Sequence, residues 1–148
     1  MEPPNSKNSD SEISLLFVEI CKRRRNVLNG QMAAAGLYAG QDRLLYHLSC
    51  SEGKEGMTVS ELAEKICIQP ATVSNMIRRM EATGLLVKNG DLHDKRTYRV
   101  SLTPKGKKTF QEVAVIWKEV HDETVRGFTE SEKHILTALL RKVVKNMG

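Results

Sequence analysis

The sequence predicts a mainly α-helical fold with a small β component, in the α+β class. A short helix is expected to open at Gln69-Pro70 and to end at Gly84, because proline suits a first helical turn and glycine suits the left-handed residue after a helix. Strand-like runs follow at 85–88 and 97–102, around a charged tip at 89–96. Long amphipathic segments flank this region on both sides.

The segment that begins at Pro70 has one apolar face and one polar face. Its polar positions carry hydroxyls, an amide and guanidinium groups, the types that hydrogen-bond base edges and phosphates: Thr72, Ser74, Asn75, Arg78 and Arg79. A shorter helix over 59–66 precedes it, with a capping box formed by Thr58 and Glu61. Two short helices followed by a basic hairpin predict a winged helix-turn-helix. The alternative for the polar face alone is plain solvation.

Asn89-Gly90 is a dipeptide typical of a two-residue hairpin turn. Residues 91–94 make a poor strand, however, whereas 97–102 alternate well between apolar and polar residues. We therefore expect a longer loop at the hairpin tip.

The remaining segments divide the chain into regions. Residues 1–10 are polar and contain two prolines, so a disordered tail is expected. Residues 11–36 and 104–148 are expected to form a helical dimerisation region, and residues 37–103 the winged helix-turn-helix domain. The terminal helices carry more apolar surface than one small domain covers, which favours a homodimer. An obligate interface of this kind buries roughly 2,000–5,000 Å². A two-fold dimer places two recognition helices about 34–36 Å apart, which predicts an inverted-repeat operator in double-stranded DNA.

Composition narrows the function classes. The 148 residues carry a formal net charge of +5, and basic residues gather in and after the hairpin. No apolar run of about 18 residues and no signal-peptide pattern occurs, so neither a membrane location nor secretion is expected. Three unpaired cysteines fit a reducing cytoplasm. Neither the cysteines nor the histidines have metal-ligand spacing, and the motifs of nucleotide-binding or hydrolytic enzymes are missing, so no metal, no cofactor and no enzymatic activity are predicted.

Several segments together resemble the multiple antibiotic resistance regulator (MarR) family of bacterial transcription factors. They are residues 58–66 (TVSELAEKI), 71–74 (ATVS), 80–87 (MEATGLLV), the motif Asp91-x-x-Asp94-x-Arg96, and 100–106 (VSLTPKG). The resemblance extends from about Ser11 to the C-terminus. It implies a homodimer of triangular outline that binds a palindromic operator, most often as a repressor released by an effector.

The resemblance also assigns roles to individual residues. Thr72, Ser74, Asn75 and Arg78 would face the major groove, and Arg79 would lie near a phosphate. Arg96 at the wing tip, with Lys95 beside it, would enter the minor groove, and Asp94 would orient Arg96 as an ion-pair partner. This chain has Gln69 where relatives often have serine, and Arg78 where an acidic residue is common.

Two regulatory hypotheses remain open. Relatives hold small phenolic or other anionic effectors between the dimer helices and the winged domain, and here Arg43, Tyr46 and His47 are candidate pocket residues. Ordinary packing near the dimer interface is the alternative for this group. Cys21 lies beside Lys22 and Arg23, which would lower the pKa of a redox-sensing thiol. A buried or inert thiol is the alternative for Cys21.

Overall fold

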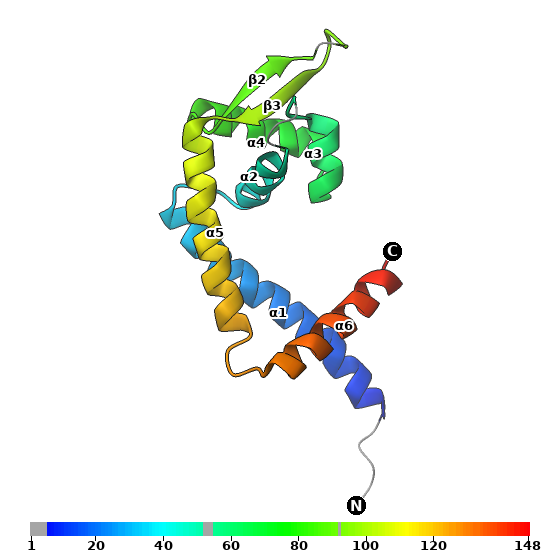
Figure 1. Cartoon of the computed structure of the whole chain (residues 1–148). Coiled ribbons are helices and arrows are strands. Elements are labelled where there is room, and N and C mark those ends of the chain that lie inside the picture. The colour runs from blue at the N-terminus through cyan, green and yellow to red at the C-terminus, as the bar shows by residue number, and fades with distance from the viewer. Residues whose placement is uncertain (1–5, 52–54, 92) are drawn as a thin grey trace, which may run out of the picture.

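The computed structural model describes residues 6–51, 55–91 and 93–148. Six helices and three short strands follow one another in the order α1 (Ser6–Ala34), α2 (Gln41–Cys50), β1 (Met57–Thr58), α3 (Val59–Ile66), α4 (Pro70–Ala82), β2 (Leu86–Gly90), β3 (Tyr98–Leu102), α5 (Pro104–Thr124) and α6 (Glu130–Asn146). The predicted mainly helical winged fold is confirmed. Helices α2, α3 and α4 and the sheet gather at one end, and α5 runs from there to α1 and α6 (Figure 1).

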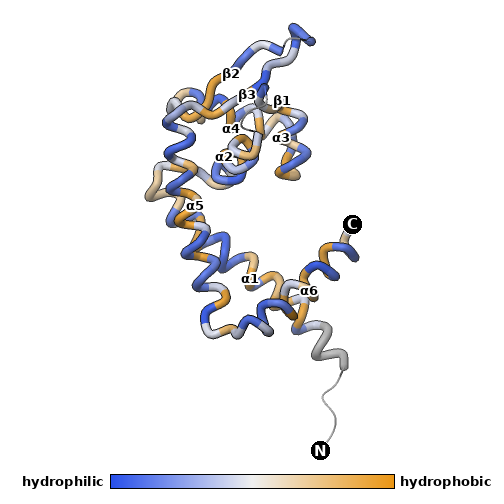
Figure 2. The backbone as a smooth tube through the Cα atoms, viewed as in Figure 1, coloured by the Kyte–Doolittle hydropathy of each residue, from blue (hydrophilic) through white to orange (hydrophobic). Residues whose placement is uncertain are grey.

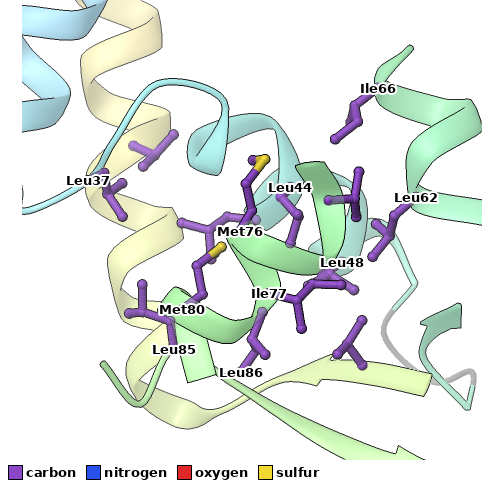
Figure 3. Packing of buried hydrophobic residues seen from close by; sticks show 14 of the residues in the cluster. Leu37, Leu44, Leu48, Leu62, Ile66, Met76, Ile77, Met80, Leu85 and Leu86 are labelled. Atoms are coloured by element: carbon purple, nitrogen blue, oxygen red, sulfur yellow. The ribbon is translucent and has the colours of Figure 1, made fainter. Parts of the chain in front are cut away.

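The hydrophobic core lies between α2, α3, α4, the sheet and the first half of α5 (Figure 3). Leu44, Leu45, Leu62 and Ile77 are completely inaccessible to solvent. Burial of one such aliphatic side chain contributes roughly 1.5–3 kcal/mol. The winged domain therefore has its own core, which fixes α4 and the sheet relative to each other.

The sheet is antiparallel with strand order β1-β3-β2. Asn89 pairs with Arg99 and Gly90 pairs with Tyr98, so the Asn-Gly dipeptide lies inside β2 rather than in a turn. The expectation of a longer hairpin loop is confirmed. Strand β2 begins one residue later and ends two residues later than predicted. Strand β1, only two residues long, was not anticipated, because so short a segment carries no periodicity.

The N-terminal boundary requires a correction. Helix α1 begins at Ser6, so the expected disordered tail is wrong for residues 6–10, whereas residues 1–5 lie outside the described part of the chain. The physical reason is that neither proline nor glycine occurs between Ser6 and Asp10, and nothing there interrupts helical hydrogen bonding.

A tight junction connects α4, β2 and α5. Gly84 has a left-handed backbone (φ 77°) directly after α4, and its carbonyl accepts a hydrogen bond from the Thr103 hydroxyl. The same hydroxyl accepts from the Gly106 amide at 3.0 Å and so caps α5. A side chain at Gly106 would lie 2.0 Å from the Leu85 carbonyl oxygen. Only glycine permits this approach, which places the wing relative to α4.

The terminal helices α1 and α6 contain hydrophobic residues along their length (Figure 2), and many of these side chains are exposed. None of the residues in α6 is buried, although its capping box at Thr129 and Glu132 forms as predicted. The exposed large apolar residues of the two helices include Ile13, Leu16, Ile20, Val27, Ile135, Leu139 and Leu140. In the part of the chain that the structure describes, no helix is long and apolar enough to cross a membrane.

Candidate nucleic-acid interface

Helix α4 separates its two faces as its sequence period requires. Val73, Ile77 and Met80 are fully buried against the core. The polar candidates lie on the other side: Thr72, Asn75, Arg78 and Arg79 are exposed and Ser74 is half-buried. Gln69 adopts the extended backbone of an N-cap but makes no side-chain hydrogen bond there, so the first turn depends on Pro70 and on packing.

Both arginines of α4 are exposed and have partners within the chain. The Arg78 guanidinium donates a hydrogen bond to the Asn75 amide oxygen, one turn earlier. The Arg79 guanidinium lies over the ring of Tyr38, 5.8 Å from its centroid. A cation–π contact at an exposed site contributes about 0.5–1 kcal/mol. Both cationic groups are thereby held close to α4 rather than extended into solvent.

Asp94 organises the loop of the wing. Its carboxylate accepts hydrogen bonds from the Arg96 backbone amide at 2.9 Å and from the Thr97 hydroxyl at 3.2 Å. The expected ion pair between Asp94 and the Arg96 guanidinium is wrong, since no carboxylate of the described residues pairs with that guanidinium. Backbone capping satisfies the carboxylate instead. Lys95 and Arg96 are both exposed, so the wing tip presents two cationic side chains.

Arg99 differs from the other basic residues of the wing, because its side chain is mostly buried. It contacts Asp91 at 3.3 Å, the Gly56 carbonyl at 3.1 Å and Glu61 at 3.5 Å. Asp91 also accepts from the His93 amide at 2.8 Å, and this bond, followed by the nearby Arg99 charge, lowers the pKa of Asp91. Arg99 is one of the basic residues that gather in and after the hairpin, and no local sequence signal indicates a partner as distant in sequence as Gly56.

Lys88, the basic residue of β2, also has partners within the chain. The Lys88 ammonium lies 4.9 Å from the centroid of the Tyr98 ring and 4.0 Å from the Glu81 carboxylate. The cationic charge of the wing that faces outward is therefore concentrated at its tip.

The three candidate effector residues do not line one pocket. Arg43 contributes to a cavity of about 470 Å³ beside α4. His47 contributes to a separate cavity of about 880 Å³, which contains Cys50, Lys65 and acidic residues. Burial, followed by the charges of Lys65 and Arg43, lowers the pKa of His47. Arg43 and His47 lie one turn apart on the same side of α2, but residues of α4 border the first cavity, whereas residues of α3 and Arg99 border the second.

Tyr46, the third candidate, lies in an aromatic cluster instead. Its ring centroid is 5.5 Å from that of Trp117 and 6.2 Å from that of Phe110, both on α5. A hydrogen bond with the Cys50 side chain raises the pKa of Tyr46. Trp117 in turn donates from Nε1 to the buried Asp42 carboxylate at 3.0 Å. This cluster connects α2 with α5, and hence the winged domain with the long helices.

The cysteines are dispersed over the chain. Cys21, Cys50 and Cys67 are free thiols, and all three are exposed, so the alternative of a buried Cys21 is wrong. Among residues 6–51, 55–91 and 93–148, no group of three histidine, cysteine or acidic side chains is arranged to hold a metal ion.

Comparison with known sequences identifies relatives of this chain. Residues 37–98 match the model of the MarR family. The HTH-type transcriptional repressor MdtR of Bacillus subtilis is 30% identical over 122 residues, which cover 82% of this chain and 77% of MdtR. The uncharacterized HTH-type transcriptional regulator YwaE of the same organism is 37% identical over 87 residues, 59% of this chain. The matched segments span only 51% of YwaE and 61% of a further B. subtilis regulator, YybA.

Solved structures share the fold. A MepR–DNA complex from S. aureus superimposes with a TM-score of 0.82 at 24% identity, and covers 90% of this chain and 96% of MepR. A mutant MarR from E. coli in complex with operator DNA gives a TM-score of 0.79 at 22% identity, with 92% and 96% coverage. At these identities the likeness concerns the arrangement of helices and strands.

Proposed function

The chain belongs to the MarR family, and from this premise we propose that it is a DNA-binding transcriptional regulator. The observation that carries the proposal is the exposed polar face of α4 next to a wing whose tip presents Lys95 and Arg96 without carboxylate partners among the described residues. A helix with an exposed polar face fits a major groove about 12 Å wide. Solved relatives with the same fold include complexes with DNA.

In the proposed complex, α4 lies in the major groove and the wing tip enters the adjacent minor groove. Thr72, Ser74 and Asn75 read base edges, because hydroxyl and amide groups match their donor and acceptor patterns. Arg78 donates one of its five N–H groups to Asn75, and the remaining donors can contact a base or a phosphate. Arg96 supplies positive charge to the minor groove, where the potential of the DNA is most negative in narrow segments.

We further propose that the active species is a homodimer on an inverted repeat. The support is the exposed apolar surface of α1 and α6, which includes Ile135 at 60% exposure and Leu139 at 53%. A second copy of the chain would remove this surface from water, at about 25 cal/mol per Å² of apolar area. Two-fold symmetry would then space the two α4 helices by about one turn of DNA.

Repression and its release complete the proposal. The relative MdtR is named a repressor, which supports the same sign of regulation in the bacterial cytoplasm. A small anionic or phenolic effector that binds between the long helices and the winged domain would shift the population toward dimers with a different separation of the α4 helices. The Trp117–Asp42 contact between α5 and α2 is the route for such a change. The alternative, redox control, is supported by the exposed thiol of Cys21.

The experiment that tests DNA binding begins with selection of bound duplexes from a random pool. Arg96→Gln is then compared with Arg126→Gln, a control that removes the same charge from an exposed arginine just after the C-terminal end of α5. Loss of Arg96 should weaken binding to all sequences and lower the slope of log K against log salt by about one. Equal effects of the two substitutions would contradict the role of the wing, and failure to enrich any duplex at low salt would contradict DNA binding.

The dimer is tested separately. Lysine at both Ile135 and Leu139 places charge in the proposed interface, so the molar mass from light scattering should fall from that of a dimer to that of a monomer. The matched control is Val87→Lys, at an apolar wing residue that is 43% exposed, and it should leave the mass unchanged. A wild-type protein that is monomeric at micromolar concentration would contradict this part of the proposal.

A further inference from the structure

The cavity beside α4 brings Arg43, a cation without an assigned role in DNA binding, next to Arg79, which the family resemblance places near a phosphate. It is lined by Tyr38 and Gly40 from the segment before α2, by Arg43 of α2, and by α4 residues that include Thr72, Asn75 and Arg79. Within the described chain, no carboxylate lines this cavity. Arg43 and Arg79 therefore place two cationic groups from different helices around one space.

The position of the cavity relative to α4 indicates what it receives. Thr72, Asn75 and Arg79 follow one another at intervals of three and four residues, so they form a single row along one side of the exposed face. Val73 and Ile77 occupy the opposite, buried side. Whatever lies in the cavity is consequently in contact with the edge of the surface that faces DNA.

The side chains around the cavity are arranged for an oxyanion. Tyr38 is 67% exposed, unusual for a large aromatic residue, and its ring faces the Arg79 guanidinium. That contact restricts the guanidinium to the cavity side of α4. The Arg43 guanidinium bends back toward Gly40, to within 4.0 Å of the position of a Cβ atom there. Two such groups supply N–H donors in the planar geometry that matches phosphate oxygens.

We propose that this cavity binds a backbone phosphate of the DNA, at the edge of the major groove that α4 enters, with Arg43 as a contact residue and Tyr38 as the residue that positions Arg79. The proposal rests on the proposed function. The volume of about 470 Å³ exceeds by an order of magnitude the roughly 30 Å³ that one water molecule occupies in the liquid. A phosphate and part of its sugar therefore fit.

The test compares Arg43→Gln with the charge-matched control Arg126→Gln on the selected duplex. Arg43→Gln should lower the slope of log K against log salt by about one. The ratio of wild-type affinity to variant affinity should therefore change by about 3.5-fold between about 50 and 200 mM salt. Preference among base sequences should stay as in wild type, because a phosphate contact carries no base information. A slope equal to that of Arg126→Gln would overturn the proposal. If wild type bound no duplex at all, the proposed function itself would fail.

Two further arms distinguish a phosphate of DNA from a free anion and test the role of Tyr38. Inorganic phosphate is titrated while the side-chain Nε–H signals of Arg43 and Arg79 are followed by NMR. Shifts with phosphate together with an unchanged DNA salt slope in Arg43→Gln would mean a free-anion site and would overturn the DNA assignment.

The role of Tyr38 is tested by the same salt slope. Tyr38→Leu should reduce the slope as much as Arg79→Gln does, and the double variant that combines the two should show no further loss. Tyr38→Phe, which keeps the ring face, should retain the wild-type slope. Additive losses would contradict the positioning role.

Discussion

Gly106→Ala is expected to destabilise the protein, although alanine is the better helix former. Gly106 lies in the first turn of α5, and the new Cβ would lie 2.0 Å from the Leu85 carbonyl oxygen and 3.3 Å from a Leu102 methyl group. The backbone must therefore move by more than 1 Å, roughly the shortfall from ordinary van der Waals contact. The Leu85 oxygen also accepts a hydrogen bond from the Thr103 amide at 3.1 Å, and this bond would be strained or lost.

The size of the destabilisation by Gly106→Ala follows from two unfavourable effects and one favourable effect. Overpacking costs about 1–3 kcal/mol, and loss of the hydrogen bond costs about 0.5–1.5 kcal/mol. Replacement of a helical glycine by alanine returns about 0.5–1 kcal/mol. The net expectation is a decrease of about 2 kcal/mol in the free energy of unfolding, together with weaker DNA binding because the wing moves relative to α4.

The control is Gly30→Ala in α1, where no atom lies within 4 Å of the new Cβ. It should stabilise the helix by about 0.5–1 kcal/mol. Both variants are measured by urea denaturation at one protein concentration, since dimerisation makes stability depend on concentration. If Gly106→Ala were as stable as Gly30→Ala, the close approach of α5 to Leu85 would be refuted.

Three other predictions follow from single contacts. The pKa of Asp91 is lowered in the folded state, so the stabilisation from its ionised carboxylate is complete above the ordinary pKa of 3.8 and is lost as the pH falls through the lower folded pKa. Asp91→Asn should therefore be less stable than wild type at pH 7. Acid denaturation curves of the two proteins should show this difference vanish in strong acid. Trp117→Phe removes the donor to the buried Asp42 carboxylate and should cost about 1–3 kcal/mol in urea denaturation, and an unchanged midpoint would contradict the contact. Thr58→Ala removes the side chain that caps α3 and should cost about 1 kcal/mol, whereas Thr58→Ser, which keeps the hydroxyl, should cost little in the same assay.

Local sequence patterns predicted most of the helices and strands of this chain. The capping box at Thr58, the proline at the start of α4 and the left-handed glycine after it act over at most four residues. Such interactions depend on spacing alone and can be read before any tertiary contact is known. The alternation after Thr97 likewise indicated β3 and argued against a turn at Asn89-Gly90, which the register confirmed.

The candidate site could be predicted only in part. The sequence indicated which residues of α4 are polar and that the wing tip is basic, and the DNA role of those residues stays a prediction. It could not indicate that Arg99 is bound to Gly56, 43 positions away, because a charged side chain has the same sequence signature whether it is free or paired. Nor could it indicate that Arg43 and His47 line different cavities, because the elements that border each cavity come from distant parts of the sequence; the binding of an effector stays a prediction.

The sequence by itself therefore determined the helices, strands β2 and β3 and the buried face of α4, because periodicity and capping arise from neighbours along the chain. Tertiary structure decided which cations remain available to a partner, and it brought Tyr38 and Arg43 beside Arg79 of α4. Pairings of this kind depend on distances between elements, which are set by packing of the whole core and leave no periodic trace in the order of the residues.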